Sequence, residues 1–419
     1  MARFSLEVRE ATSLFRNRPF RQLWAAQFSA LTVAYGLALA GIALVEGQTR
    51  SGAQTGLMIV SSILPAFLAS LVAGAVVDRW ERVRVLRASH LARAVVALAF
   101  WGGTEWLPSG AALTAAYAAN AAVAAFSQFA MSAEMALLPD LAGRARLMSA
   151  NALLQLNMLV AEGVGIVFLG PLVVKLAGVP AMGLVGAPLC ALALALVTSL
   201  PGDGTSAGRA GERWRGWAAF GSDLQAGWRT IARDPLLRLV TAQATLAAVL
   251  LLVLLSLVPG LVSRHLGLSV EDAPFLMLPG GLGFGLGATL IGRWERWLSR
   301  RDWIAAGLTG VGVATALMGA LAGQGESVRL WPFQVLILGV GLALALVIIP
   351  ARTVLQERPP ADMRGRVIAA QLALGNAVAV VPLLMGGALA DKMGIRPVLG
   401  LLGLLALGGG VVGWYQARP

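Results

Sequence analysis

The chain is patterned as long apolar segments separated by short polar ones. A helix needs about 20 apolar residues to cross the hydrocarbon layer of a membrane. Measured against that length, the pattern predicts an all-α integral membrane protein with twelve transmembrane helices. The spans are expected at 20–45, 54–77, 86–107, 110–138, 149–174, 179–200, 236–262, 273–292, 303–323, 330–351, 366–390 and 396–415.

Sequence features of the first six spans recur in the second six. The tetrapeptide RWER stands at 79–82 and again at 293–296, and Pro19 matches Pro235 at a similar offset. Such a parallel repeat predicts two pseudo-symmetric six-helix bundles. The expected organisation is an N-terminal bundle at 1–200, a cytoplasmic linker at 201–234 and a C-terminal bundle at 235–419.

The linker carries a helical pattern in its second part. Its large apolar residues recur every three or four positions, which is the spacing of one helical face. These residues are Trp214, Trp217, Phe220, Leu224, Trp228 and Ile231. The pattern predicts an amphipathic helix, with two arrangements left open. The helix either lies in the lipid headgroup layer or packs on the cytoplasmic face of the protein itself.

Composition excludes several classes of protein. The chain is 58% hydrophobic and 13% charged, with a mean hydropathy of +0.75, whereas soluble domains are about 25% charged. The net charge of +12 does not indicate a nucleic-acid partner, because the basic residues are scattered over short connections. Of the 33 Lys and Arg residues, 27 fall on the side of the termini, with Arg93 counted in a loop there. This bias predicts that both termini are cytoplasmic.

Metal and cofactor chemistry is not expected from this sequence. Cys190 is the only cysteine, and His90 and His265 are predicted near opposite membrane surfaces. No phosphate-binding G-x-x-x-x-G-K-[ST] motif is present, so no ATP site is expected. We therefore predict no metal, no cofactor and no enzymatic activity.

The connection after the second span is dense in charge. It reads GAVVDRWERVR from Gly74, and its arginines mark a membrane surface because they are costly in hydrocarbon. This stretch resembles the signature loop of the major facilitator superfamily. The stretches NRPFRQLWAAQ, PDLAGRARLMSANALL and RGRVIAAQ resemble the bacterial exporter branch that contains macrolide-efflux and enterobactin-exporter proteins. The resemblance extends over essentially the whole chain.

The resemblance implies a cytoplasmic gate. In relatives the loop aspartate holds the two halves together, and Asp78 occupies that position here. Asp78 would face the start of the eleventh span, where a helix N-terminus stabilises a carboxylate by about 0.3–1 kcal/mol. Gly74 is expected to let another helix approach closely. The gate residues are therefore predicted to be Gly74, Asp78, Arg79, Arg82, Arg84, Arg364 and Arg366.

Acidic residues inside spans are the candidates for proton coupling, because such charges are costly in a membrane. Glu162 is the first candidate, since it falls near the middle of the fifth span. Glu134 is the second, because it lies only five residues before Pro139, at a depth from which a carboxylate often reaches water. Neutral polar side chains within spans either line a cavity or bridge helices. The candidates for cavity lining are Asn120, Gln128, Asn151, Gln155, Met158, Gln371 and Asn376.

The resemblance implies a function that the residues alone do not fix. We expect a monomeric secondary transporter in the bacterial inner membrane that exports a small amphipathic compound, such as a drug or siderophore, in exchange for protons. An importer, a facilitator or a lipid flippase of the same fold is the alternative. Substrate-dependent efflux from loaded cells distinguishes these functions.

Overall fold

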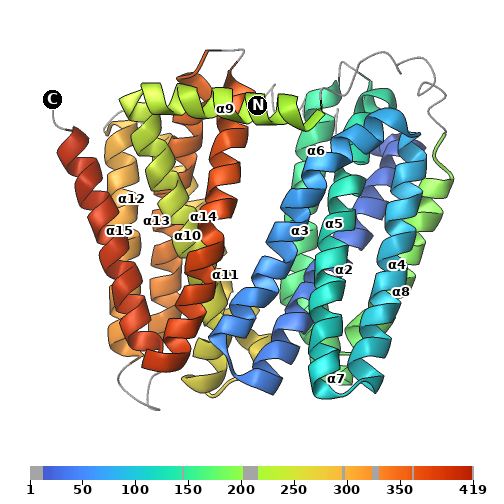
Figure 1. The fold of residues 1–419 in the computed structure, drawn as a ribbon, viewed down its shortest axis with the longest axis horizontal. Coiled ribbons are helices and arrows are strands. Elements are labelled where there is room, and N and C mark those ends of the chain that lie inside the picture. The colour runs from blue at the N-terminus through green and yellow to red at the C-terminus, as the bar shows by residue number, and fades with distance from the viewer. Residues whose placement is uncertain are drawn as a thin grey trace. The chain divides into compact units, whose positions relative to one another are not determined.

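The computed structural model describes residues 13–143, 146–201, 216–294, 298–322, 330–360 and 363–417, and within these ranges every regular element is a helix. Eleven helical segments in these ranges are long and apolar enough to cross a membrane. The predicted all-helical membrane fold is therefore confirmed (Figure 1). Arg144 and the linker residues 202–215, including Trp214, lie outside the described residues.

The chain forms two compact units. The first comprises Met1–Gln48 and Met58–Trp214. Its elements are α2 (Arg18–Thr49), most of α3 (Gly52–Arg79), α4 (Arg82–Trp106), α5 (Ser109–Ala142), α6 (Leu147–Gly163), the π-helix η2 (Val164–Leu169), α7 (Gly170–Ala177) and α8 (Ala181–Thr198). One of its cores joins Leu23 and Ala30 of α2 to Leu86 of α4 and Ala133 of α5.

The second unit comprises Thr49–Leu57 and Arg215–Pro419. Its elements are the start of α3, α9 (Gly216–Arg233), α10 (Pro235–Arg264), the 3-10 turn η3 (Val270–Asp272), α11 (Ala273–Trp294), α12 (Arg300–Leu321), α13 (Leu330–Glu357), α14 (Arg364–Met393) and α15 (Ile395–Ala417). Within it α12 packs against α13 and α15, α11 against α13, and α10 against α14. Its core is built from apolar residues of these helices, such as Leu250, Ile304, Phe333 and Leu399.

Helix α4 is the expected span that differs most from an ordinary membrane helix. It has 25 residues and packs against α5 and α8, but it is not among the eleven apolar spans. The reason is its polar content, because Arg82, Arg84, Arg87, His90 and Arg93 all lie on it. Two of these side chains, His90 and Arg93, are buried in the bundle, so part of the polarity of α4 faces the protein core rather than the lipid.

The predicted span 149–174 is a helix with a change of pitch. Helix α6 ends at Gly163, the π-helix η2 follows, and α7 begins at Gly170. Pro171 removes one backbone donor at this junction. A side chain on Gly165 would overlap the backbone of Thr32 in α2, so the wide turn lies where two helices approach closely. Such π-turns are frequent at functional sites.

The amphipathic pattern of the linker forms helix α9. In its C-terminal half, Leu224, Trp228 and Ile231 pack on the core of the second unit, and Ile231 is 3% exposed. Asp223 forms a 2.8 Å ion pair with Arg366 at the start of α14. From Asp223 onward, α9 therefore packs on α10 and α14 of its own unit, which agrees with one of the two arrangements that the sequence left open.

Candidate functional site

The first unit buries a cluster of polar side chains. Glu134 of α5 is only 3% exposed, and its Oε2 accepts a hydrogen bond of 2.7 Å from Nε2 of Gln27 in α2. The Oε1 atom of Gln27 accepts a second hydrogen bond of 2.7 Å, from Nδ2 of Asn157 in α6. Asn157 also donates to the carbonyl of Trp24 at 2.9 Å. The cluster thus joins α2, α5 and α6 through one chain of hydrogen bonds.

Arg93 of α4 brings a positive charge to this cluster. It is 2% exposed, and its Nη2 donates to the carbonyl of Ala30 in α2. Its Nε has no hydrogen-bond partner among the described residues. Arg93 lies close enough to Glu134 for the two charges to interact. A buried charge is very costly unless it is paired, so the carboxylate and the guanidinium depend on each other.

A cavity of about 380 Å³ opens onto the cluster. Glu134, Gln27 and Arg93 line it, together with Tyr35, which adds an aromatic ring. Three of the predicted cavity residues also line it, namely Asn120, Gln128 and Met158. The remaining wall is largely apolar. A site of this kind holds a small molecule that carries both apolar surface and a few polar groups.

The other predicted cavity residues lie elsewhere. Nδ2 of Asn151 donates to the carbonyl of Leu147 in its own helix at 3.0 Å, and Gln155 is exposed. Gln371 and Asn376 are half-buried on α14 in the second unit. The sequence placed these residues in spans correctly, but it did not show which way each side chain faces.

The two candidate acids have environments different from those that the sequence suggested. Glu134 is buried in the bundle, so the expectation that it reaches water from near the membrane surface is wrong. Glu162 is exposed on α6, one residue before the end of that helix and two before the π-helix η2. Glu134 is therefore the acid held by a hydrogen bond inside the bundle, and the mid-span depth of Glu162 does not by itself bury it.

The sequence also misplaced α4. Arg93 was counted with the surface arginines, and His90 was expected near a membrane surface, but both are buried. Neither nitrogen of His90 has a hydrogen-bond partner among the described residues. The signal that could have corrected this was the expected span 86–107 itself, because it already contained both His90 and Arg93.

The predicted gate residues lie at the ends of their helices. Asp78 is exposed near the end of α3, and Arg82 pairs with Asp140 of α5 at 2.8 Å. Arg84 pairs with Glu81 at 2.5 Å. Arg79 and Arg364 are exposed. Within the first unit, no described atom lies within 4 Å of a side chain added to Gly74, so no helix of this unit makes the expected close approach there.

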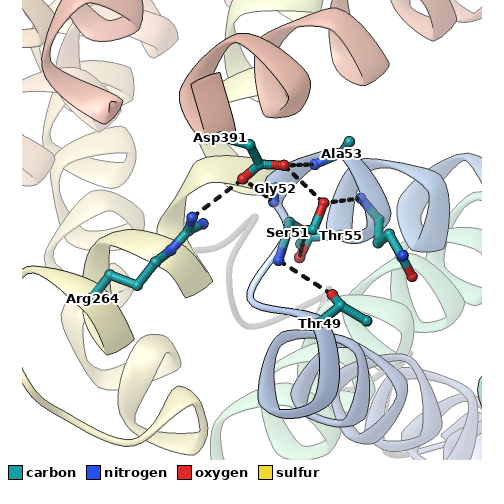
Figure 2. A network of polar contacts seen from close by, with 8 residues as sticks. Thr49, Ser51, Gly52, Ala53, Thr55, Arg264 and Asp391 are labelled. Atoms are coloured by element: carbon teal, nitrogen blue, oxygen red, sulfur yellow. Dashed lines mark hydrogen bonds and ion pairs between the residues drawn. The ribbon is translucent and has the colours of Figure 1, made fainter. Parts of the chain in front are cut away.

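A second polar site, in the second unit, was not found from the sequence. Asp391 in the last turn of α14 accepts hydrogen bonds from the N–H groups of Gly52 and Ala53, at 2.7 and 3.1 Å. It also accepts one from Oγ of Ser51 at 2.7 Å, and Nη1 of Arg264 lies 3.2 Å away (Figure 2). Asp391 therefore caps the N-terminus of α3 with its side chain, while Arg264 balances its charge.

Backbone contacts surround this capped helix start. A side chain on Gly387 would overlap the carbonyl of Gly52, so α14 and the start of α3 touch through their backbones. A side chain on Gly56 would likewise crowd the carbonyl of Leu383 at 2.9 Å. One signal in the sequence was available, because an aspartate in the last turn of a helix opposes the helix dipole. Such a residue needs a partner outside its own helix.

Metal binding has no support in this geometry. Among the residues that the structure describes, no group of three or more His, Cys, Asp or Glu side chains is placed to hold a metal ion. The free thiol of Cys190 is buried in α8. The chemistry that the first-unit cluster offers is proton exchange at a carboxyl group beside a buried cation.

Known proteins resemble this chain along most of its length. It is 27% identical over 411 residues to the multidrug efflux pump Tap of Mycolicibacterium fortuitum, covering 93% of this chain and 94% of that protein. The fold is similar to that of the peptide transporter POT in complex with sulfate, with a TM-score of 0.68 and 14% identity over 96% of this chain and 94% of the other.

A variant of the nucleoside transporter NupG gives a TM-score of 0.67 at 14% identity, over 96% of this chain and 100% of the other. These two structures support the fold alone. The family model of the major facilitator superfamily matches residues 23–382. The chain is therefore a multi-pass membrane transporter of small molecules that belongs to the major facilitator superfamily.

Proposed function

We propose that this transporter exports a small amphipathic compound in exchange for protons, by alternating access, and that Glu134 carries the proton. The supporting observation is the buried carboxyl group of Glu134, which lines a cavity and accepts a hydrogen bond from Gln27. Intramembrane carboxyl groups of this kind mark proton and substrate pathways in transporters. The proposal ranks Glu134 ahead of Glu162.

The partners of Glu134 suit a group that gains and loses a proton. The N–H of Gln27 can donate to a carboxyl oxygen in either protonation state, so this hydrogen bond survives the exchange. Arg93 favours the charged carboxylate, whereas burial favours the neutral acid. When substrate or water enters the cavity, the balance between these two effects changes. The proton can then be taken up in one conformation and released in the other.

One proton is enough to drive export. Moving one charge inward across the membrane is worth about 2.3 kcal/mol per 100 mV. A 100-fold concentration gradient costs about 2.7 kcal/mol. A single titrating carboxyl group therefore supplies the required free energy once the membrane potential reaches about 120 mV, and no nucleotide is needed.

Export of a drug-like compound is favoured over the alternatives by two observations. The curated relative is described as a multidrug efflux pump, and the cavity of the first unit combines polar groups with apolar wall. An importer, a facilitator or a lipid flippase remains the alternative function. Efflux from cells loaded with a fluorescent drug tests the direction, because an importer would instead raise the drug level in the cells.

The gate and the membrane topology complete the proposal. The excess of basic residues on the side of the termini supports an inner-membrane protein with both termini cytoplasmic. Asp78 is proposed to pair with the helix start that carries Arg364 and Arg366 when the cytoplasmic side closes. In the structure Arg366 pairs with Asp223 at 2.8 Å, so this proposal requires Arg366 to exchange partners during transport.

The test uses protein reconstituted in proteoliposomes. A pH gradient is imposed, a trapped dye reports internal pH, and a panel of lipophilic drugs and siderophores is added. We expect drug-dependent proton movement in the wild type and in Glu162→Gln, and none in Glu134→Gln. The two variants carry the same substitution in the same unit, so each controls for the other.

Two results would count against the proposal. Loss of proton movement in Glu162→Gln but not in Glu134→Gln would assign the proton to Glu162. If no compound moved protons in wild-type protein that is monodisperse and folded, proton-coupled export would be wrong. A facilitator or a flippase would then be the better function.

A further inference from the structure

The second unit contains a cavity that is separate from the polar site of the first. It has a volume of about 260 Å³ and lies among α10, α11, α12, α13 and α15. Its lining comes from the later turns of α10 and α12, from the early turns of α11 and α15 and from the middle of α13. Because successive spans run in opposite directions, the lining extends from the middle of the second unit toward the membrane face opposite the linker.

The lining of this cavity is apolar throughout. Among the described residues, it consists of aliphatic side chains, two methionines, one phenylalanine and glycine backbone. Met277 and Phe284 come from α11, Met318 from α12, and Leu254 and Leu261 from α10. No side chain in the lining carries a charge or a hydrogen-bonding group. A charged ligand would therefore lose its hydration without compensation.

Glycines create the space. A side chain on Gly341 of α13 would overlap the backbone of Gly280 in α11, so these two helices touch through their backbones. Both glycines and the neighbouring Gly281 line the cavity. Peptide backbone without side chains offers a flat wall, and the thioethers of Met277 and Met318 add polarizable atoms that make favourable contacts with aromatic rings.

We propose that this cavity is a binding site for a compact, uncharged, ring-bearing molecule. The size agrees with that chemistry, because an apolar cavity of about 150 Å³ holds one benzene ring. A cavity of about 260 Å³ then has room for a group the size of two fused rings. A lipid acyl chain is the competing occupant, but the flat glycine wall and the two thioethers favour a planar ring over a flexible chain.

The chain offers a matched pair of substitutions for a test. Gly281 lines the cavity, and a side chain built there would meet no atom within 4 Å. Gly281→Leu therefore adds a bulky apolar side chain at the cavity wall, starting from a Cβ that meets no neighbouring atom. Gly285 lies one turn later on α11 and is not part of the lining. A side chain added there would also meet no atom within 4 Å. Gly285→Leu is the control for a leucine at an equally open position.

The experiment uses the purified full-length protein in lipid nanodiscs, without any gradient. The probe is an uncharged trifluoromethyl phenyl diazirine, which is activated by light and located by peptide mass spectrometry. In the wild type we expect labelling of peptides that contain Met277, Phe284 or Met318, reduced severalfold by excess naphthalene. Gly281→Leu should lose the naphthalene-sensitive labelling, and Gly285→Leu should keep it.

The opposite results overturn the proposal. If excess naphthalene did not reduce the labelling of the wild type, no ring-binding site would exist there. The wild type carries no substitution, so disturbed folding could not explain that result. Equal naphthalene-sensitive labelling in wild type and Gly281→Leu would place the site elsewhere. If a free fatty acid reduced the labelling and naphthalene did not, the cavity would be assigned to an acyl chain. The readout is binding, so it does not depend on which compound is transported or on proton coupling.

Discussion

The carboxylate of Asp391 accepts a hydrogen bond of 2.7 Å from the backbone N–H of Gly52, although the two residues lie 339 positions apart in the chain. This contact caps the N-terminus of α3, where a negative charge also complements the helix dipole. Oγ of Ser51 donates to the same carboxylate and accepts from the N–H of Gln54 at 3.3 Å (Figure 2). The start of α3 therefore depends on a residue from α14.

Removing this cap should loosen the start of α3. Asp391→Ala removes the carboxylate that accepts hydrogen bonds from the N–H groups of Gly52 and Ala53. It also removes the carboxylate that pairs with Arg264. Loss of a helix cap costs about 0.5–2 kcal/mol. We expect faster hydrogen–deuterium exchange in the peptide 49–57. Asp140→Ala is the control, because it breaks an ion pair of the first unit, with Arg82. Equal exchange in both variants would show that Asp391 does not hold this segment.

Arg93 and Glu134 should be coupled in stability. Arg93→Gln alone leaves a buried carboxylate without its cation, and breaking a buried charge pair by removing one partner costs about 3–5 kcal/mol. Adding Glu134→Gln removes the stranded charge, so the double variant should melt at a higher temperature than Arg93→Gln. Thermal unfolding in detergent of the wild type, both single variants and the double variant measures this coupling. Additive effects would mean that the two charges do not interact.

The start of α10 should respond to pH. Asp234 is its N-cap and accepts hydrogen bonds from the N–H groups of Leu236 and Leu237 at 2.8 and 3.3 Å, and Arg358 pairs with it at 2.8 Å. Burial raises the pKa of Asp234, but the hydrogen bonds from Arg358 and the two amides and the Arg358 charge outweigh this and lower it overall. The charged form is therefore stabilised by folding.

The sign of the pH effect follows from this lowered pKa. Stability from Asp234 is fully present above the pKa of an unfolded aspartate, about 3.9, and is lost as pH falls through the lower folded pKa. Asp234→Ala should thus melt earlier than the wild type at pH 7, and the difference should shrink under strongly acidic conditions. Asp234→Asn keeps a capping side chain, so its melting temperature at pH 7 should fall less than that of Asp234→Ala. A pH-independent difference would argue against the ionised cap.

Two glycines of α9 should respond oppositely to the same substitution. Alanine in a helix interior is favoured over glycine by about 0.5–1 kcal/mol. Gly221→Ala should gain this, because a side chain there meets no atom within 4 Å. Gly227→Ala should instead destabilise, because its side chain would overlap the backbone of Arg366. Trypsin cleavage at Arg229 and Arg233 reports whether α9 stays docked. Similar cleavage of both variants would contradict the observed packing.

The sequence by itself determined the helices and the family. A membrane span must satisfy its own backbone hydrogen bonds within hydrocarbon, so length and apolarity define it locally. The expected spans match the helices for this reason, and the charged loop after α3 indicated the superfamily that the family model confirms. The charges of α4 still obscured the burial of Arg93, because this arginine resembled a surface residue in the sequence.

Only the tertiary structure decided which polar residues meet. The depth of a residue in a span can be counted along the chain, but the direction of its side chain depends on how each helix is rotated against its neighbours. This is why Glu162 looked the more buried acid although Glu134 has the partners. It is also why Asp391 gave so little signal, since its partners Gly52 and Ser51 belong to a distant part of the chain.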